Sequence, residues 1–246
     1  MICFLTSSTR TEDDSALNPA NSFARELQHT IKSPCKALFI CSDPDDSAYT
    51  DYKAEGVRVN FSDAGIRFSD YQVLDRRTQA KAAELVCHAE LIFLAGGHVP
   101  TQNRFFQEIG LAALLKDHPG VLIGMSAGSM NSAATVYAHP ELEGEAIDPN
   151  YRRWLPGLGL TEIMILPHYQ AIKDDVLDGL RVFEDIAYPD SKGKSFYCLV
   201  DGSYLLIRDG ETQLRGEAYR IHDGKLECIC KENEYIMLTN GGISHD

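Results

Sequence analysis

The stretch VLIGMSAGS, residues 121–129, carries the strongest structural signal in this sequence of 246 residues. Its apolar run leads into the pentapeptide GMSAG, residues 124–128, which fits the pattern G-x-S-x-G. This pattern requires a buried strand, a sharp turn that lifts the serine hydroxyl clear of the sheet, and a helix. That helix would begin at Ala127 and point its amide dipoles at negative charge near Ser126. We therefore expect Ser126 to be a nucleophile; the alternative is a Gly/Ser-rich turn that only packs a helix on a sheet.

Similar apolar runs occur along the chain on both sides of this stretch. ICFL, KALFIC and LIFLA precede it and IMIL follows it, with segments of helical spacing between them. Continuous apolar strands that alternate with helices indicate a parallel sheet covered on both faces. The predicted fold class is α/β, a doubly wound and mostly parallel sheet flanked by helices, which binds ligands at the carboxyl ends of its strands. Helices are expected near residues 22–31, 47–64, 77–89, 100–116, 127–137 and 171–186.

The pattern changes after residue 191. FYCLV and SYLLI flank Asp201-Gly202, a two-residue hairpin signal, and shorter runs separated by turn residues follow. We expect this tail to form a small antiparallel C-terminal extension of the sheet, within a single α/β domain of residues 1–246.

The charge and cysteine content exclude several classes of protein. With 23 Lys+Arg against 36 Asp+Glu, the net charge of −13 argues against a protein that follows nucleic-acid phosphates. No run approaches the ~20 apolar residues of a membrane span, and the start MICFLTSS is unlike a secretory signal. Seven scattered cysteines are typical of reduced thiols in a cytoplasmic protein. We expect a cytoplasmic monomer or homodimer with no metal, no other cofactor and no nucleic-acid or membrane partner.

The segment LAGGH, residues 94–98, offers a possible partner for the serine. It follows the strand LIFL, so its glycines should lie at the same carboxyl edge as Ser126. A serine nucleophile needs amide donors that face the developing oxyanion, and the backbone N–H groups of Gly97 and Ala127 are the candidates. A plain strand-to-helix turn is the alternative. His98 is either a substrate contact or a loop residue.

A serine nucleophile also needs a base, and His168 is the best of eight histidines. It follows the strand TEIMIL and Pro167, which places it at a strand end, where a neutral imidazole can accept the serine proton. Alternatively, His168 only caps the helix that follows it. The residues alone do not identify the carboxylate that orients His168, because Asp201, the candidate at a strand end, also suits an ordinary hairpin turn. The candidates are Asp201, Asp148, Glu141, Glu143 and Glu145.

Five pieces of sequence, in this order, resemble peptidase family S51, which includes dipeptidase E and cyanophycinase. They are AGGH (95–98), GMSAGS (124–129), GLGL (157–160), LPHY (166–169) and LVDGSYLL (199–206). The resemblance implies a fold related to class I glutamine amidotransferases and a Ser–His–acid triad. It carries the nucleophile onto Ser126 and the base onto His168. For the acid, which follows the strand after the next helix, this sequence offers Asp201.

The resemblance implies a serine peptidase that acts without a cofactor on small peptides, Asp-containing dipeptides among them, through an acyl-enzyme. The loop after Gly97 departs from the family, and within it we select Gln102 as a substrate contact. An acidic substrate would need a basic pocket, for which the candidates are Arg104, Arg152, Arg153 and Lys173.

Two other functions stay open, an esterase and a non-catalytic binding protein, whereas the serine at position 126 argues against a third, a glutamine amidotransferase. An α/β-hydrolase esterase is disfavoured because its acid precedes a late histidine, whereas His168 follows Ser126 closely. A glutamine amidotransferase would carry cysteine at position 126. A non-catalytic binding protein on the same fold is the alternative from a different class.

Overall fold

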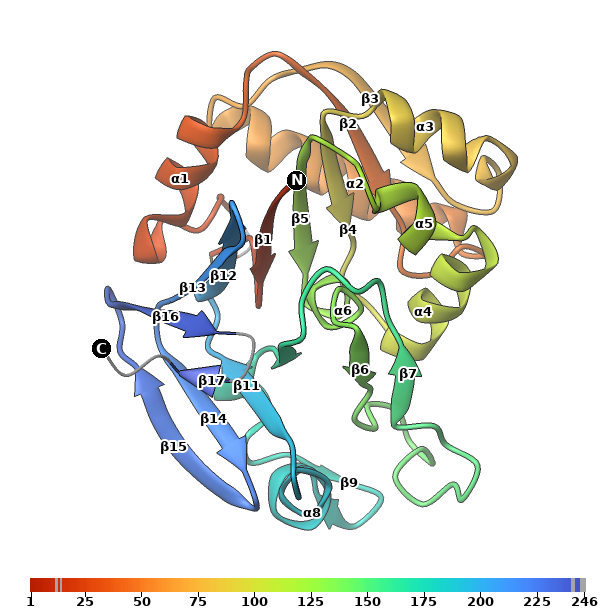
Figure 1. The fold of residues 1–246 in the computed structure, drawn as a ribbon. Coiled ribbons are helices and arrows are strands. Elements are labelled where there is room, and N and C mark those ends of the chain that lie inside the picture. Colours follow the sequence, from red (N-terminus) through yellow and green to blue (C-terminus); the bar gives the residue numbers. More distant parts are fainter. Residues whose placement is uncertain (12, 14, 240–241, 244–246) are drawn as a thin grey trace.

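A nine-stranded sheet runs through the centre of the computed structural model, which describes residues 1–11, 13, 15–239 and 242–243 (Figure 1). The strand order is β17-β16-β13-β12-β1-β5-β4-β2-β3. The pairs from β1 to β3 are parallel, and β12, β13, β16 and β17 extend the sheet with antiparallel pairs. The strands are β1 (Ile2–Thr6), β2 (Cys35–Ile40), β3 (Phe68–Leu74), β4 (Leu91–Leu94), β5 (Val121–Met125), β12 (Tyr204–Arg208), β13 (Glu211–Arg215), β16 (Tyr235–Thr239) and β17 (Gly242–Ile243).

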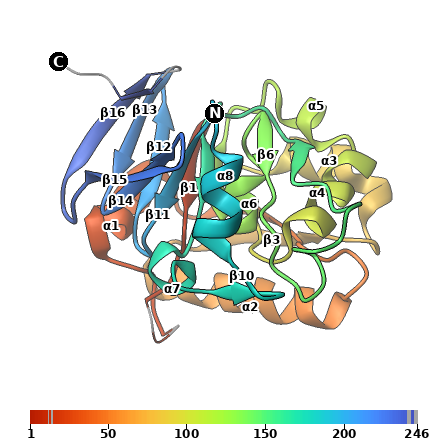
Figure 2. The ribbon, with the colours of Figure 1, turned by 90° about the horizontal axis from the view of Figure 1, so that it is seen from below.

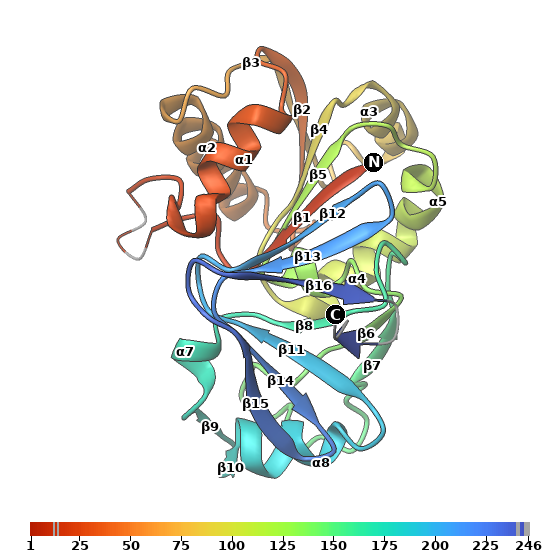
Figure 3. The ribbon, with the colours of Figure 1, turned by 60° about the vertical axis from the view of Figure 1, so that its left-hand side comes forward.

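Helices cover both faces of this sheet, as Figure 3 shows edge-on. Because successive strand residues point to opposite faces, the buried strands supply two cores. One core packs Phe39, Phe93 and Ile123 against α1 (Phe23–Thr30) and α2 (Ser47–Asp63). The other packs Leu38, Ile92 and Leu122 against α3 (Ala82–His88), α4 (Val99–Glu108) and α5 (Leu111–Leu115). The predicted α/β class, with a mostly parallel sheet flanked by helices, is confirmed.

A second sheet of four strands lies beside the first, in the order β15-β14-β11-β8. Its strands are β8 (Met164–Leu166), β11 (Ser195–Leu199), β14 (Ala218–His222) and β15 (Lys225–Cys230). The chain passes between the two sheets from β11 to β12, from β13 to β14 and from β15 to β16, and the sheets diverge from these crossings (Figure 3). Hydrogen bonds from Val200 N to Glu217 O (3.2 Å) and from Gly216 N to Glu234 O (2.9 Å) join the crossings.

This arrangement corrects the prediction of a hairpin at Asp201-Gly202. β11 pairs with β8 and β14, whereas β12 pairs with β1 and β13, so Asp201 lies on a crossing between sheets. The IMIL run likewise supplies β8 of the second sheet rather than a strand of the central one. The predicted antiparallel extension is found, but only half of the tail belongs to it. An Asp-Gly turn is a local signal, while strand pairing is decided by distant segments.

Two predicted helices are largely replaced by other structure. In segment 127–137, α6 (Ala127–Met130) ends after one turn and β6 (Thr135–Tyr137) pairs with β7 (Trp154–Pro156). In segment 171–186 the structure has α7 (Tyr169–Ile172), the hairpin β9 (Val176–Leu177) and β10 (Leu180–Arg181), and a π-helix (Val182–Ala187) before α8 (Tyr188–Asp190), elements that Figure 2 shows from below. β-Branched residues favour β6, and Asp178 and Gly179, both with positive φ, make the hairpin turn.

The remaining differences are smaller. Segment 100–116 is split between α4 and α5 at Gly110, whose φ of +64° ends the first helix. Segment 77–89 starts as a short 3-10 turn (Gln79–Lys81), and another such turn (Ala20–Ser22) precedes α1. β3 is missing from the prediction because it lies at the sheet edge and most of its residues are not buried. No helix in the described part of the chain is long and apolar enough to cross a membrane.

Candidate active site

Ser126 occupies the turn between β5 and α6 in a backbone conformation that side chains rarely adopt. Its φ is +49° and its ψ is −111°. The turn is held from both sides: Ser126 N donates to Thr6 O (3.0 Å), and Ser126 O accepts from the N–H groups of Ser129 (2.9 Å) and Met130 (3.0 Å). Such strained positions persist only where the surroundings enforce them, and they cluster at functional sites.

The two glycines of the motif are required by close packing around this turn. A Cβ at Gly124 would lie 3.0 Å from the backbone nitrogen of Ser129, and a Cβ at Gly128 would lie 2.6 Å from Cβ of Leu94. Real Cβ atoms essentially never show the distance at Gly128, and the distance at Gly124 is tighter than nine in ten real Cβ contacts. The pattern G-x-S-x-G therefore lets α6 pack directly on the ends of β4 and β5, with Ser126 at the top of the turn.

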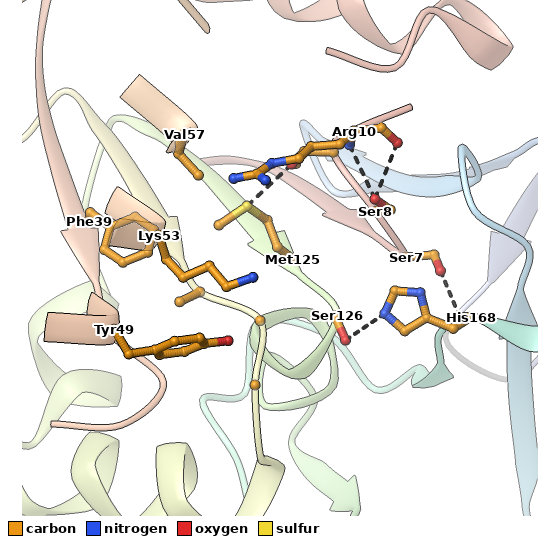
Figure 4. A pocket seen from close by; sticks show the side chains of 14 residues that line it. Ser7, Ser8, Arg10, Phe39, Tyr49, Lys53, Val57, Met125, Ser126 and His168 are labelled. Atoms are coloured by element: carbon orange, nitrogen blue, oxygen red, sulfur yellow. Dashed lines mark hydrogen bonds between the residues drawn. The ribbon is translucent and has the colours of Figure 1, made fainter. Parts of the chain in front are cut away.

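His168 comes to Ser126 from the other sheet. It follows β8 and has a left-handed conformation, φ +57° and ψ 32°, in which its N–H donates to Ser7 Oγ (2.7 Å). Its Nε2 lies 2.9 Å from Ser126 Oγ (Figure 4). The structure thus brings together the predicted nucleophile and the predicted base, 42 residues apart in sequence.

Asp201 completes a chain of three side chains. Its Oδ1 lies 2.8 Å from His168 Nδ1 and accepts from Ser7 Oγ (2.6 Å), while its Oδ2 accepts from Gln170 Nε2 (2.7 Å). Burial acts to raise the pKa of Asp201, but the hydrogen bond and charge of His168, with the bonds from Ser7 and Gln170, hold it below its ordinary value. An ionised Asp201 keeps the proton on Nδ1, which leaves the Nε2 lone pair facing Ser126.

None of the four other candidate carboxylates, all in the described part of the chain, is hydrogen-bonded or ion-paired to His168. Asp148 accepts from the N–H of Asn150 (2.8 Å) within its own loop. Glu145 lies 2.8 Å from Nε2 of His98, so His98 anchors the loop of Glu145. Glu141 and Glu143 have no side-chain bond to either histidine, and Asp201 alone of the five candidates is placed to orient His168.

The amide groups predicted to face the oxyanion border the serine. A Cβ at Gly96 would lie 3.3 Å from Cβ of Ser126, so the loop after β4 touches the serine, and a Cβ at Gly97 would collide with Ser42. Neither Gly97 N–H nor Ala127 N–H donates to a group in the part of the chain that the structure describes. Gly97 lines a cavity beside Ser126, whereas Ala127 is fully buried directly after the serine.

Gln102 does not fit the predicted role of substrate contact, and that prediction was wrong. Its side chain is fully buried, and its Nε2 donates to Ala95 O (2.7 Å) and Cys41 O (3.3 Å). Its Oε1 accepts from Asn131 Nδ2 (3.0 Å). Gln102 therefore ties the loop after β4 to the segment after α6. A buried amide with satisfied partners is a structural element, and burial of this kind depends on tertiary packing.

A cavity of about 270 Å³, which we call the first pocket, opens beside Ser126 and His168 (Figure 4). Residues 95–97 form one wall, and Arg10 and Lys53 enter it from the loop after β1 and from α2. None of the four predicted basic candidates lines it or the other cavity at Ser126. Arg153, one of them, is paired with Asp190 (2.9 Å) instead.

The sequence reasoning missed Ser7, Gln170, Arg10 and Lys53. Ser7 and Arg10 belong to the polar run TSSTR, which follows the apolar run ICFL. The strand formed by ICFL ends at the same sheet edge as Ser126. A search for polar residues after every parallel strand would have found them. Lys53 lies within a long helix, and nothing in its neighbourhood in sequence distinguishes it. Among the described residues, no group of three or more His, Cys, Asp and Glu side chains is placed to hold a metal ion.

Comparison with known proteins gives a family match and two related folds. The model of the family described as "Peptidase family S51" matches residues 3–215. A peptidase from an acI-B1 Actinobacterium has a TM-score of 0.63 at 17% identity, covering 96% of each chain. A protein assigned as peptidase E from Listeria monocytogenes EGD-e has a TM-score of 0.59 at 16% identity, covering 93% of this chain and 98% of that one. No curated protein matches the sequence.

Proposed function

This chain belongs to peptidase family S51 and is a serine-type peptidase. On that premise we propose that it hydrolyses small peptides with an acidic residue on the acyl side, and that Ser126, His168 and Asp201 carry out the reaction. The observation that carries the proposal is the unbroken chain of hydrogen bonds, 2.9 Å from Ser126 Oγ to His168 Nε2 and 2.8 Å from His168 Nδ1 to Asp201 Oδ1. A nucleophile, a base and an orienting carboxylate need this order of contacts.

The proposed reaction has two steps. Ser126 Oγ attacks the peptide carbonyl carbon while its proton passes to His168 Nε2, and the N–H groups of Gly97 and Ala127 stabilise the oxyanion. His168 then protonates the leaving nitrogen, the C–N bond breaks and an acyl-enzyme ester remains. A water molecule gives a proton to His168 and attacks this ester, and the proton returns to Ser126 as the acid is released. Losing one oxyanion donor typically costs ~10²–10³ in rate.

A fluorophosphonate probe tests the nucleophile directly. The wild-type protein is expected to be labelled at Ser126, because the probe reacts with serines activated by a neighbouring imidazole. Ser126→Ala should abolish labelling, while Ser69→Ala, at an exposed serine on β3, should leave it unchanged. Intact-mass spectrometry measures the adduct. Absence of labelling in folded wild-type protein would instead favour a non-catalytic binding protein.

Cationic side chains that line the first pocket support the acidic preference. Lys53 Nζ and the Tyr49 hydroxyl point into this cavity in Figure 4, and Arg10 crosses above them. Lys53 is only partly exposed, so its charge is less screened than on an open surface. A carboxylate on the acyl residue would meet these cations and the hydroxyl of Ser8.

Replacing Lys53 by methionine is expected to lower kcat/KM for Asp-Leu amide at least about tenfold relative to Asn-Leu amide. The physical reason is loss of a charge-assisted contact that only the carboxylate can make. Lys32→Met is the matched control, since Lys32 borders a cavity at the opposite end of the strands. Steady-state assays of both amides give the ratio. An unchanged ratio in Lys53→Met would remove Lys53 from substrate recognition, and cleavage of p-nitrophenyl esters without either amide would favour an esterase.

A further inference from the structure

A second cavity, of about 460 Å³, lies on the other side of the candidate nucleophile. Of the residues that the structure describes, it shares only Ser126 and His168 with the first pocket. The apolar side chains of Ile172, Val176 and Val182 form part of its wall. Its other polar side chains are His139, Glu141 and Asp175. We call this cavity the second pocket.

The position of the oxyanion loop decides which half of a substrate each pocket would take. Gly96 and Gly97 line the first pocket and not the second, whereas Pro167, directly before His168, and Ile172, four residues after it, line the second. In a tetrahedral adduct the leaving nitrogen faces the imidazole that protonates it, and the acyl residue extends to the other side. The residue on the leaving side therefore belongs in the second pocket, a step that rests on the proposed function.

His139 offers this pocket a hydrogen-bond acceptor. The residue is 7% exposed, and its Nδ1 lies 3.1 Å from the carbonyl oxygen of Pro140. Burial lowers the pKa of His139, so its imidazole is neutral at neutral pH. Since Nδ1 donates to a carbonyl, Nε2 carries the lone pair, and Nε2 is bonded to no group among the described residues.

The two carboxyl groups add acceptors of the same kind. The Asp175 carboxylate makes no hydrogen bond or ion pair with any described residue, although Asp175 lines the cavity. Glu141 is exposed as a residue, yet desolvation of its carboxyl group and the nearby charge of Glu145 raise its pKa to about 8. A cation placed beside this carboxyl group would favour its ionised form. Among the described residues that line this pocket there is no lysine or arginine.

The wall that carries Glu141 is held in place by two carboxylates. Oε2 of Glu145 accepts from the N–H groups of Glu141 (2.9 Å) and Leu142 (3.0 Å). The Asp178 carboxylate, in the turn between β9 and β10, accepts from the N–H groups of Gly144 (2.9 Å) and Ala146 (3.0 Å). The pocket is therefore formed before a ligand enters, which lowers the entropy cost of binding.

We propose that the second pocket is the subsite for the leaving residue and selects a basic side chain, arginine or lysine. Both side chains carry only donors at their tip and an aliphatic stem that suits Ile172, Val176 and Val182. The enzyme thus binds opposite charges on the two sides of the scissile bond: a substrate carboxylate beside Lys53 and a substrate cation beside Asp175.

The test compares kcat/KM for four dipeptide amides: Asp-Arg, Asp-Lys, Asp-Leu and Asp-Glu. Amides are used because a free terminal carboxylate would add a charge of its own. The two basic amides are expected to be cleaved at least about tenfold faster than Asp-Leu, and Asp-Glu most slowly. Asp175→Asn should lower the Arg-to-Leu ratio about fivefold, and Asp174→Asn, at the adjacent exposed residue that does not line the pocket, should leave the ratio unchanged.

Failure of this inference is distinct from failure of the proposed function. Ser126-dependent cleavage of Asp-Leu as fast as Asp-Arg, or a ratio that Asp175→Asn does not move, overturns the basic selectivity while the peptidase mechanism stands. Absence of any Ser126-dependent cleavage overturns the proposed function and the subsite together. Melting temperatures within a few degrees of wild type show that the variants are folded.

Discussion

His168→Ala is expected to lower kcat/KM for a peptide substrate by at least ~10³-fold, and up to ~10⁶-fold if the three side chains act as one unit. His168 Nε2 lies 2.9 Å from Ser126 Oγ and is the side-chain group bonded to the serine hydroxyl. Without the imidazole, no other described side chain is hydrogen-bonded to Ser126 Oγ to accept its proton. A hydroxyl that keeps its proton is a weak nucleophile at neutral pH.

The backbone at His168 needs a second variant. Its φ of +57° strains alanine, whereas asparagine tolerates this region, so His168→Asn separates loss of chemistry from loss of fold. His29→Ala, at an exposed histidine of α1, is the control. Combining Ser126→Ala with His168→Ala should cost little more than either change alone. Near-normal turnover in His168→Asn would exclude the imidazole from the mechanism.

Asp201→Asn is expected to lower kcat about 10⁴-fold with little change in stability. An amide in place of the carboxylate can donate to His168 Nδ1, which moves the ring proton to Nε2 and removes the lone pair that faces Ser126. In this orientation the remaining oxygen still accepts from Gln170 Nε2, which lies 2.7 Å from Oδ2 in the wild type, and this contact holds the side chain in place. Ser7 Oγ, which donates to Oδ1 at 2.6 Å in the wild type, loses that acceptor. Single-turnover assays measure the effect on the acylation step.

Asp148→Asn is the matched control for Asp201→Asn. Asp148 is the other aspartate considered for the acid, and its carboxylate bonds Asn150 within an exposed loop. We expect its kcat to stay within about twofold of wild type. If Asp201→Asn kept the wild-type kcat while Asp148→Asn lost it, Asp148 would be the orienting carboxylate instead of Asp201.

The parts of the fold that sequence patterns predicted well are those set by local burial. Five apolar runs became strands, and the motif around Ser126 became the expected strand, turn and helix. The errors fall where local signals were weak or ambiguous. Asp201-Gly202 has the composition of a hairpin turn but carries the chain between two sheets, and the pattern after residue 171 is helical only in short pieces.

Sequence reasoning alone also selected Ser126, His168 and Asp201, because each follows an apolar strand and the ordered motifs resemble one family. The contacts between them were decided by the tertiary structure: Ser126 comes from the nine-stranded sheet, His168 from the four-stranded sheet, and Asp201 from a crossing between the two. The same holds for Gln102, which is buried, and for Lys53, which faces the first pocket. Periodicity reports whether a residue lies on a buried face, which is a local property of the chain. The sheet that a strand joins, and the cavity that a side chain lines, depend on packing between distant segments, so only the folded chain determines them.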